Sequence, residues 1–259
     1  MIDMSQPLIS IITINFNNKK GLARTIESVV KQTVPDYEYI LIDGGSTDGS
    51  IDIIKQHQNK LAYWISEKDK GIYDAMNKGI QKASGKYLLF LNSGDCFINS
   101  VVLEKVNEAM RTNQYDIIYG NSIFNNGESV RYNPTPLSLL NVLRLGISHQ
   151  AFFLKKELFD KAGLYNIMYK VVADSCHLIT CLVKYNASSL YINAIIAEIE
   201  PDGISMASTG QNRKEQQLFM RTEFIALQND YELLLTYYKR DYLTRIRKFM
   251  VRKFKLRNH

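Results

Sequence analysis

Residues 8–49 read LISIITINFNNKKGLARTIESVVKQTVPDYEYILIDGGSTDG, a run that alternates between strand and helix patterns. Residues 8–14 are dominated by Ile and Leu, as in a strand that is buried on both faces. Apolar residues recur at helical spacing between 22 and 30, and a second apolar run follows at 39–42. A helix between two such strands predicts a βαβ unit with parallel strands.

The same alternation continues along the chain. We predict further strands at 63–65, 87–91, 116–119, 150–154 and 190–199. Helices are predicted at 72–82, 100–112, 155–161 and 174–184, with a loop at 201–212 and helical structure from 213 onward. The pattern therefore predicts an α/β fold with a doubly wound, mostly parallel sheet and a C-terminal helical appendage.

Two helix starts have candidate capping residues. Asn17 or Asn18 is expected to cap the helix after the first strand. Ser46 or Thr47 is expected to cap a helix that opens directly from the glycine-rich turn at 44–49.

The composition excludes several classes of protein. Of the 259 residues, 46% are hydrophobic and 22% are charged, as in soluble globular domains and unlike disordered or collagen-like chains. The formal charge is +6, but residues 239–259 alone carry nine Lys or Arg and one Asp. The remaining 238 residues hold 23 basic and 25 acidic side chains. A near-neutral body does not suit a nucleic-acid partner, and we expect none.

The basic C-terminal stretch has a helical pattern of its own. Leu243, Ile246, Met250 and Phe254 recur at three- and four-residue steps among the basic residues of 239–259. Such a basic amphipathic helix suits an anionic membrane surface. A solvated helix on the body, or a disordered end, is the alternative interpretation.

The remaining features favour a cytoplasmic protein. Cys96, Cys176 and Cys181 form neither a CxxC pair nor an even disulfide set. The first residues lack the pattern of a signal peptide, and no apolar run reaches the roughly 18–20 residues of a membrane span. We expect a soluble protein, or one peripheral to the cytoplasmic face of the inner membrane.

Polar residues gather where the predicted strands end. Acidic side chains follow three of these strands, and in an open α/β sheet ligands bind beyond the carboxyl ends of the strands. A carboxylate-rich edge beside glycine turns suits a divalent cation that bridges phosphate oxygens. Caps and turns are the structural alternative for any single member. The candidates are Thr13, Asn15, Asn17, Asp43, Glu67, Asp69, Asn92 and Asp95.

Several common sites are absent from the sequence. No GxGxxG follows the first strand, and no GxxxxGK[ST] occurs, so dinucleotide and P-loop sites lack their motifs. HExxH and GxSxG are also missing, which removes the motifs of zincin proteases and α/β-hydrolases.

Five segments stand in order along the chain: Ser10–Asn17, Thr25–Thr33, Tyr39–Gly49, Ser66–Ile80 and Gly85–Asp95. Together they resemble the family 2 glycosyltransferases. Weaker resemblance continues through Ser148–Gln150 to Ala173–Asp174, so it covers roughly residues 8–185. The resemblance implies a GT-A fold, a nucleotide-sugar donor, a divalent metal (Mn²⁺ or Mg²⁺) and inversion at the anomeric carbon.

The resemblance also implies roles for individual residues. Asp95 matches the last acidic position of the family's metal motif, and Asp174 falls where the family places its catalytic base. His149 and Gln150 match a pair near the donor and the acceptor. The nucleotide and donor side would be lined by Thr13, Asn15, Asp43, Asp69, Gly71, Asp74, Asn77, Ser93 and Gly94.

The chain departs from the family pattern at two of these places. The motif at 92–95 reads Asn-Ser-Gly-Asp, with one acid where many relatives have two or three, and Ala173 stands where many relatives have Glu. One carboxylate with phosphate oxygens and water is still a known way of holding Mg²⁺. For Asp174, the alternative to a base is the N-cap of the helix at 174–184, and for His149 it is a structural role.

The expected protein is thus an inverting, metal-dependent glycosyltransferase that acts on a glycan or lipid-linked acceptor in surface polysaccharide biosynthesis, with a UDP-sugar favoured. Residues 1–120 are expected to bind the donor, 121–212 to supply the acceptor side and the base, and 213–259 to form the basic helical tail. Two alternatives stay open: a catalytically inactive nucleotide-sugar-binding or scaffold protein, and a nucleotidyltransferase.

Overall fold

A computed structural model describes residues 6–112, 114–124, 129–200, 209–226, 229–230, 233–234, 236–240 and 244. The chain divides into two compact units, Met1–Thr209 and Gly210–His259.

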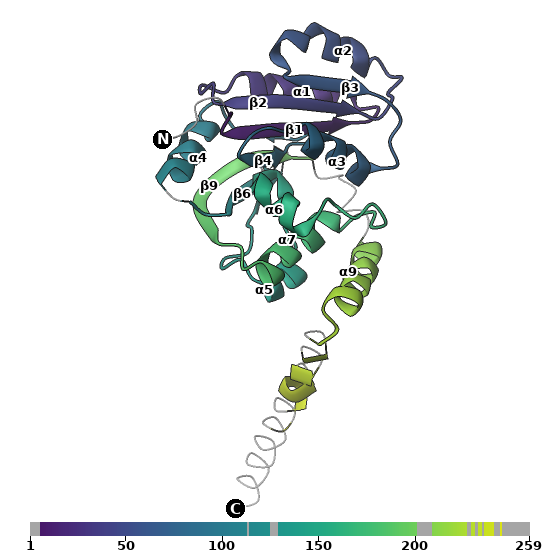
Figure 1. Ribbon diagram of the computed structural model, residues 1–259, viewed down its shortest axis with the longest axis vertical. Coiled ribbons are helices and arrows are strands. Elements are labelled where there is room, and N and C mark those ends of the chain that lie inside the picture. Colours follow the sequence, from purple (N-terminus) through teal and green to yellow (C-terminus); the bar gives the residue numbers. More distant parts are fainter. Residues whose placement is uncertain are drawn as a thin grey trace, which may run out of the picture. The chain divides into compact units, whose positions relative to one another are not determined.

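The first unit is built on a twisted sheet with helices on both faces (Figure 1). Within the described residues the sheet has nine strands in the order β3-β2-β1-β4-β8-β6-β9-β5, and β7 pairs with β6 beside this path. The strands are β1 (Ile9–Asn15), β2 (Tyr37–Asp43), β3 (Tyr63–Ser66), β4 (Tyr87–Phe90), β5 (Cys96–Phe97), β6 (Ile117–Phe124), β7 (Val130–Arg131), β8 (Phe152–Lys155) and β9 (Ser189–Ile199).

The helices of the first unit connect these strands. They are α1 (Lys19–Val30), α2 (Ser50–Gln56), α3 (Ile72–Lys82), α4 (Val102–Thr112), α5 (Leu139–Leu145), α6 (Lys156–Ala162) and α7 (Ala173–Lys184). Two short 3₁₀ turns, η1 (Gln58–Lys60) and η2 (His149–Ala151), complete the list.

The longer strand pairings of the sheet are parallel, and this sets where the functional edge lies. Strands β1 to β4 are parallel to one another, as are β6 and β9, while β8 is antiparallel to both β4 and β6. Because β1, β2 and β3 run in the same direction, their carboxyl ends meet at one edge of the sheet. The predicted doubly wound, mostly parallel α/β fold is confirmed.

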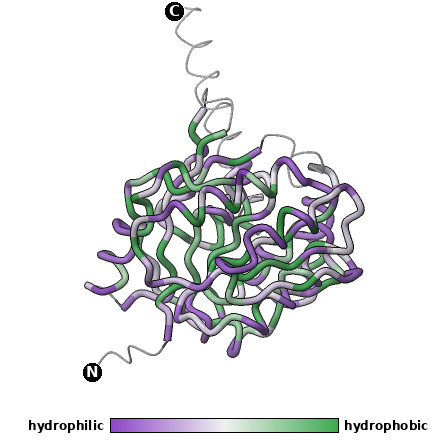
Figure 2. Tube along the Cα trace, turned by 90° about the horizontal axis from the view of Figure 1, so that it is seen from above, coloured by the Kyte–Doolittle hydropathy of each residue, from purple (hydrophilic) through white to green (hydrophobic). Residues whose placement is uncertain are grey.

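Strand β1 lies at the centre of the core because every one of its residues is buried. Ile9 and Ile11 join the apolar cluster under α1, α2 and α4, while α3 packs on β1 and β2. Gly79 permits this packing, since a Cβ at that position would lie 2.4 Å from Ile12 Cγ2. Figure 2 shows the result as apolar segments through the middle of this unit and polar segments around its edge.

The cap of the first helix is confirmed, and the predicted cap after the glycine-rich turn is wrong. Asn18 caps α1, because its Oδ1 accepts a hydrogen bond from Gly21 N at 3.0 Å. Helix α2 begins only at Ser50, whose backbone N–H donates to Asp48 Oδ1 at 3.0 Å. Ser46 is not available as a cap because its own N–H and hydroxyl both bind Asp43.

The first unit also contains short elements that the sequence pattern did not predict. Strands β5 and β7 and helix α5 are new, and the predicted strand at 150–154 begins as η2 and becomes β8 only at Phe152. The register of β5 and β7 is set by β9 and β6. Such short pairings are fixed by distant partners and not by a local pattern.

The second unit is mostly helical where it is described. Helix α9 (Thr209–Glu223) begins inside the predicted loop at 201–212, of which 201–208 lie outside the described residues. Only 239, 240 and 244 of the predicted amphipathic helix at 239–259 are described, so that prediction lies almost wholly outside the structure. Among the described residues, no helix combines the length and the apolar character that a membrane crossing requires.

His177 predicts an acid-sensitive component of stability in the first unit. Its ring stacks on Phe159 at a centroid distance of 4.3 Å, and burial lowers the pKa of His177 to about 4 although the Gly163 backbone and the Asp174 carboxylate oppose this shift. The unfolded chain therefore binds a proton below about pH 6.5 that the folded chain refuses until about pH 4. Stability falls as the pH drops through this window, by roughly 2–3 kcal/mol.

Urea unfolding at pH 7.0 and at pH 4.5 measures this loss. Other acid groups contribute to the same pH range, so the wild type is compared with His177→Phe, which fills the aromatic site without a titrating ring. We expect the variant to lose roughly 2–3 kcal/mol less stability than the wild type between the two pH values. Equal losses in both proteins would refute this assignment.

Candidate active site

The ends of β1, β2 and β3 meet around the Asp43 carboxylate. Asn15 and Asp43 are register partners, and Asp43 is the partner of Ser66 on its other side. Asp43 Oδ1 accepts from Asn15 Nδ2 at 2.7 Å and from the Ser46 hydroxyl at 2.6 Å. Its Oδ2 accepts from the N–H groups of Gly45 and Ser46 and from the Ser66 hydroxyl at 2.6 Å. The carboxylate therefore fixes the glycine turn that follows β2.

Asp43 is ionised despite its position. Burial raises the pKa of Asp43, but its hydrogen bonds to Ser46, Ser66 and Asn15 outweigh burial and hold the pKa below its ordinary value. The neighbouring Thr13 is also fully buried, and its hydroxyl donates to the Leu91 carbonyl oxygen at 2.7 Å. Thr13 thus ties β1 to the chain after β4.

The loop before α3 lies against this turn. A Cβ on Gly44 would lie 2.6 Å from Asp69 Oδ2, so the two loops are in close contact. Asp69 Oδ1 accepts from Gly71 N at 2.9 Å, and Asp74 Oδ2 accepts from Lys70 N at 2.9 Å. Phe16 stands beside the same turn with 64% of its surface exposed. An exposed aromatic ring next to polar loops is a feature that the sequence analysis missed.

The polar atoms of Asn77 do not face the strand ends around Asp43. Its Oδ1 accepts from Tyr165 N at 2.9 Å and its Nδ2 donates to Tyr165 O at 2.8 Å, so both polar atoms are used inside the protein. Asn77 therefore ties α3 to the loop that precedes α7.

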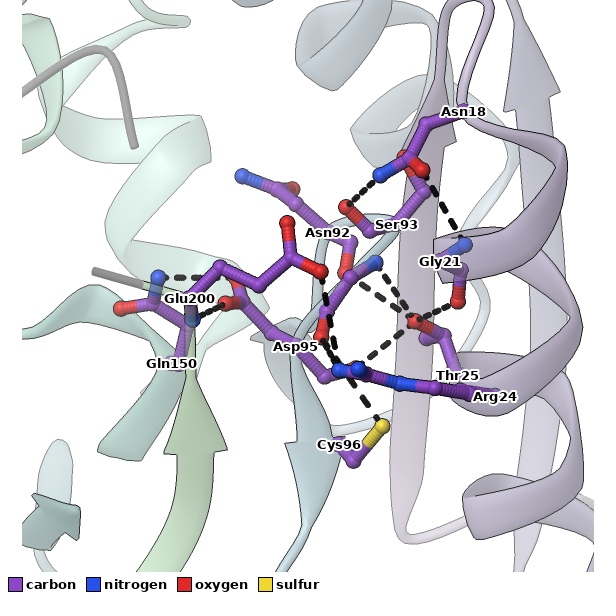
Figure 3. Close-up of polar contacts among 11 residues, drawn as sticks. Asn18, Gly21, Arg24, Thr25, Asn92, Ser93, Asp95, Cys96, Gln150 and Glu200 are labelled. Carbon is purple, nitrogen blue, oxygen red and sulfur yellow. Dashed lines mark hydrogen bonds and ion pairs between the residues drawn. The ribbon is translucent and has the colours of Figure 1, made fainter. Parts of the chain in front are cut away.

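Side chains of α1 and of its N-cap bind the backbone of the turn at 92–95 (Figure 3). Asn18 Nδ2 donates to the Ser93 carbonyl oxygen at 3.1 Å, and Arg24 Nη2 donates to the Gly94 carbonyl oxygen at 2.7 Å. Thr25 Oγ1 accepts from Gly94 N at 2.9 Å. Gly94 has φ +106°, a conformation that favours glycine, so the turn closes sharply before Asp95.

Asp95 faces the second half of the unit. Its Oδ2 accepts from Gln150 Nε2 at 2.8 Å and its Oδ1 accepts from Glu200 N at 3.2 Å, as Figure 3 shows. Burial raises the pKa of Asp95 to about 6, against the opposing effects of Gln150 and His149. A buried carboxyl group of this kind gains from a nearby cation, which favours its charged form.

Asp174 lies in the first turn of α7, and three donors surround it. His149 Nδ1 is 3.2 Å from its Oδ2, and the Tyr73 hydroxyl donates to its Oδ1 at 3.2 Å. Ser175 N donates to the same Oδ1 at 2.7 Å. Burial raises the pKa of Asp174, but the hydrogen bonds that it accepts from His149, Ser175 and Tyr73 hold the pKa below its ordinary value. The alternative of an N-cap is wrong, because Val172 is the N-cap of α7.

The adjacent residues His149 and Gln150 reach both acidic groups. His149 contacts Asp174, and Gln150 binds Asp95. Asn92 Nδ2 lies 3.2 Å from His149 Nε2, which joins the turn at 92–95 to η2 a second time. Asn92, a candidate from the strand ends, and Tyr73 are therefore part of the site. Glu200 joins them, although nothing in the sequence predicted it. Glu200 carries no sequence signal, since it is 105 residues from Asp95.

The arrangement combines an ionised carboxylate with a second, buried carboxyl group on one edge of the sheet. Among the described residues, no group of three or more His, Cys, Asp or Glu side chains is placed to hold a metal ion by itself. Any cation at Asp95 therefore takes most of its ligands from a bound molecule or from water.

Comparisons with known proteins agree on one family. Residues 10–176 match the family model described as Glycosyl transferase family 2. A PGL/p-HBAD biosynthesis glycosyltransferase from Mycobacterium bovis is 31% identical over 204 residues, which cover 77% of this chain and 79% of the relative.

Solved structures share the fold at low sequence identity. The structure of S. aureus TarS 1-349 in complex with UDP-GlcNAc has a TM-score of 0.66 and 20% identity, and covers 78% of this chain and 61% of that one. Mannosyltransferase PcManGT from Pyrobaculum calidifontis, in complex with GDP-Man and Mn²⁺, has a TM-score of 0.60 and 15% identity, over 78% and 59%. The chain spans about three fifths of each of these solved chains.

Proposed function

Because the chain belongs to glycosyl transferase family 2, we propose that it is an inverting enzyme that uses a nucleotide-sugar donor, with a UDP-sugar favoured. The acceptor in this proposal is a glycan or a lipid-linked oligosaccharide of surface polysaccharide biosynthesis. Residues 1–120 bind the donor, and 121–212 supply the acceptor side and the base. The observation that carries the proposal is the pair of acidic groups, Asp174 and Asp95, joined through His149 and Gln150.

Asp174 is the general base in this mechanism. Its carboxylate takes the proton from the acceptor hydroxyl as that oxygen bonds to the anomeric carbon. The bond between the anomeric carbon and the donor phosphate oxygen breaks, and its electron pair leaves with the nucleoside diphosphate. The pKa of Asp174 lies below its ordinary value, so the side chain is an ionised carboxylate at neutral pH, which is the form that a general base requires.

The nucleotide lies over the ends of β1, β2 and β3. Asn15 and Asp43 form the floor of this pocket, and the exposed ring of Phe16 stacks on the base. Thr13 and Asn77 support the pocket from inside, since their polar atoms bind the protein itself. The remaining donor contacts are assigned to Asp69, Gly71, Asp74, Ser93 and Gly94.

Asp95 is the protein ligand of a divalent cation, Mn²⁺ or Mg²⁺. The donor set fits such an ion, because a carboxylate oxygen that accepts one hydrogen bond retains a lone pair, and hard cations are often held by one or two carboxylates with phosphate oxygens and water. When bound, the cation stabilises the charge of the departing diphosphate. The neighbour PcManGT, which is in complex with GDP-Man and Mn²⁺, supports a metal in this fold.

The preference for UDP comes from the family resemblance of the sequence. The solved neighbours include both bases, since TarS is in complex with UDP-GlcNAc and PcManGT with GDP-Man. A guanine nucleotide is therefore the alternative that a binding experiment should include.

Donor cleavage by the purified protein tests this function. Four donors (UDP-glucose, UDP-galactose, UDP-GlcNAc and GDP-mannose) are incubated with Mn²⁺ and a bacterial lipid extract, and the released nucleotide is measured. We expect one UDP-sugar to release UDP with wild type and not with Asp174→Asn. If nucleotide binds but every donor stays intact, the chain is a catalytically inactive nucleotide-sugar-binding protein.

The tail at 239–259 is the proposed membrane contact, which places the enzyme on the cytoplasmic face of the inner membrane. It carries nine Lys or Arg, each worth about 1 kcal/mol near an anionic surface. Truncation after residue 238 is expected to lower co-sedimentation with phosphatidylglycerol vesicles more than tenfold at low salt. Phosphatidylcholine vesicles are the control, and equal sedimentation of both proteins with the anionic vesicles contradicts the proposed contact.

A further inference from the structure

Both ring nitrogens of His149 have a partner in the site. Nδ1 lies 3.2 Å from Asp174 Oδ2, and Nε2 lies 3.2 Å from Asn92 Nδ2. The three residues come from different elements: His149 from η2, Asn92 from the end of β4 and Asp174 from α7. One side chain therefore joins the turn at 92–95 to the proposed base.

The partner of Nε2 determines where the imidazole proton is. An amide nitrogen only donates, so a ring nitrogen that faces it accepts and carries no proton. In the neutral ring the proton then belongs to Nδ1, which faces the Asp174 carboxylate. The Asp174 carboxylate, which only accepts hydrogen bonds, requires the same proton on Nδ1. Asp174 and the Asn92 amide nitrogen thus favour one tautomer, which donates a hydrogen bond to Asp174.

The same contact prevents His149 from serving as the base itself. The lone pair of Nε2 is occupied by Asn92, and Nδ1 carries the proton. Neither nitrogen of this tautomer has a free lone pair for an acceptor hydroxyl. Asp174 is left as the group that accepts the proton.

The surroundings hold His149 in this position. Gln150 is tied to Asp95, and the Ser148 N–H donates to Asn133 Oδ1 at 2.8 Å. The Ser148 and Ser122 hydroxyls are 2.7 Å apart. Residues on both sides of His149 are therefore anchored, and the ring has little freedom to leave Asp174.

We propose that His149 is a positioning residue, which holds Asp174 in one orientation through its Nδ1 proton and couples that orientation to the donor turn at 92–95 through Asn92. The inference rests on the proposed function, because it assigns His149 a part in the same transfer. In this proposal the position of the turn at 92–95 affects the orientation of the Asp174 carboxylate.

Two substitutions separate this role from simple packing. In His149→Asn the amide nitrogen can occupy the place of Nδ1, whereas in His149→Gln it reaches the place of Nε2. We expect His149→Gln to lower kcat about 10- to 100-fold with an unchanged donor KM, and His149→Asn to recover most of kcat. Equal urea midpoints and equal UDP affinity show that both variants are folded. Equal kcat values for the two variants would overturn the proposal.

An NMR measurement tests the tautomer without relying on activity. The chain has four histidines, so His149 is assigned by the signal that His149→Asn removes from the ¹⁵N-imidazole spectrum. We expect a proton on Nδ1 and none on Nε2 at pH 7.5, and a shift of both nitrogens in Asn92→Ala. A proton on Nε2 overturns the proposal even if the enzyme is active. If the wild type shows the expected tautomer but cleaves no donor, the proposed function fails and the assignment of the proton stands.

Discussion

Asp174→Asn is expected to lower kcat for donor cleavage about 10²- to 10⁴-fold, because a general base contributes on this scale. The amide keeps the size of the side chain and can still accept hydrogen bonds from Tyr73 and Ser175. It cannot take the proton of an acceptor hydroxyl. The affinity for UDP is expected to stay within about threefold, since the loss belongs to the chemical step.

The measurement combines nucleotide-release kinetics with calorimetric titration of UDP. Asp160→Asn is the matched control, because it makes the same change on the exposed surface of α6. If Asp174→Asn turns over at the wild-type rate, Asp174 is not the general base. A joint loss of turnover and UDP binding would instead point to a structural role for Asp174.

Asp95→Ala is expected to have the second large effect, on nucleotide binding in the presence of metal. With Mn²⁺ the Kd for UDP should rise at least about tenfold, which corresponds to about 1.4 kcal/mol. With EDTA the wild type and the variant should bind UDP almost equally, because the carboxylate acts through the cation.

Asp52→Ala is the control for this experiment, since it removes an exposed carboxylate from α2. Titrations of UDP and GDP into the three proteins measure both the metal effect and the choice of base. If the wild type binds UDP equally with and without Mn²⁺, the assignment of a metal ion to Asp95 is wrong. The transferase proposal then stands without a metal at Asp95.

The sequence predicted the parts of the fold that local patterns control. The helix expected at 72–82 is α3 with the same bounds, and Asn18 caps α1 as predicted. The ends of the parallel strands also bring Asn15 and Asp43 together, which follows from strand direction alone.

Long-range contacts limited what could be predicted about the site. Glu200 reaches Asp95 because β5 pairs with β9, and no local pattern announces that pairing. Thr13 and Asn77 lie among the predicted donor residues, yet their polar atoms bind Leu91 and Tyr165. A motif gives the position of a residue along the chain, but the packing decides which way its side chain points.

The separate partners of the adjacent residues His149 and Gln150 could not be predicted from the sequence either. Their order in the sequence gives no hint that they divide between two acidic groups. The 3₁₀ geometry of η2 directs successive side chains to different partners, so one short turn serves both the proposed base and the proposed metal ligand.

The most direct test of an inverting transfer is the configuration of the sugar that leaves the donor. Water replaces the unknown acceptor, and ¹H NMR follows the first minutes of cleavage of an α-linked UDP-sugar before the released sugar equilibrates. If the transfer inverts and Asp174 is the base, the β anomer appears first with wild type and does not appear with Asp174→Asn. An α anomer formed first, or equal β-anomer release by Asp174→Asn, would contradict it.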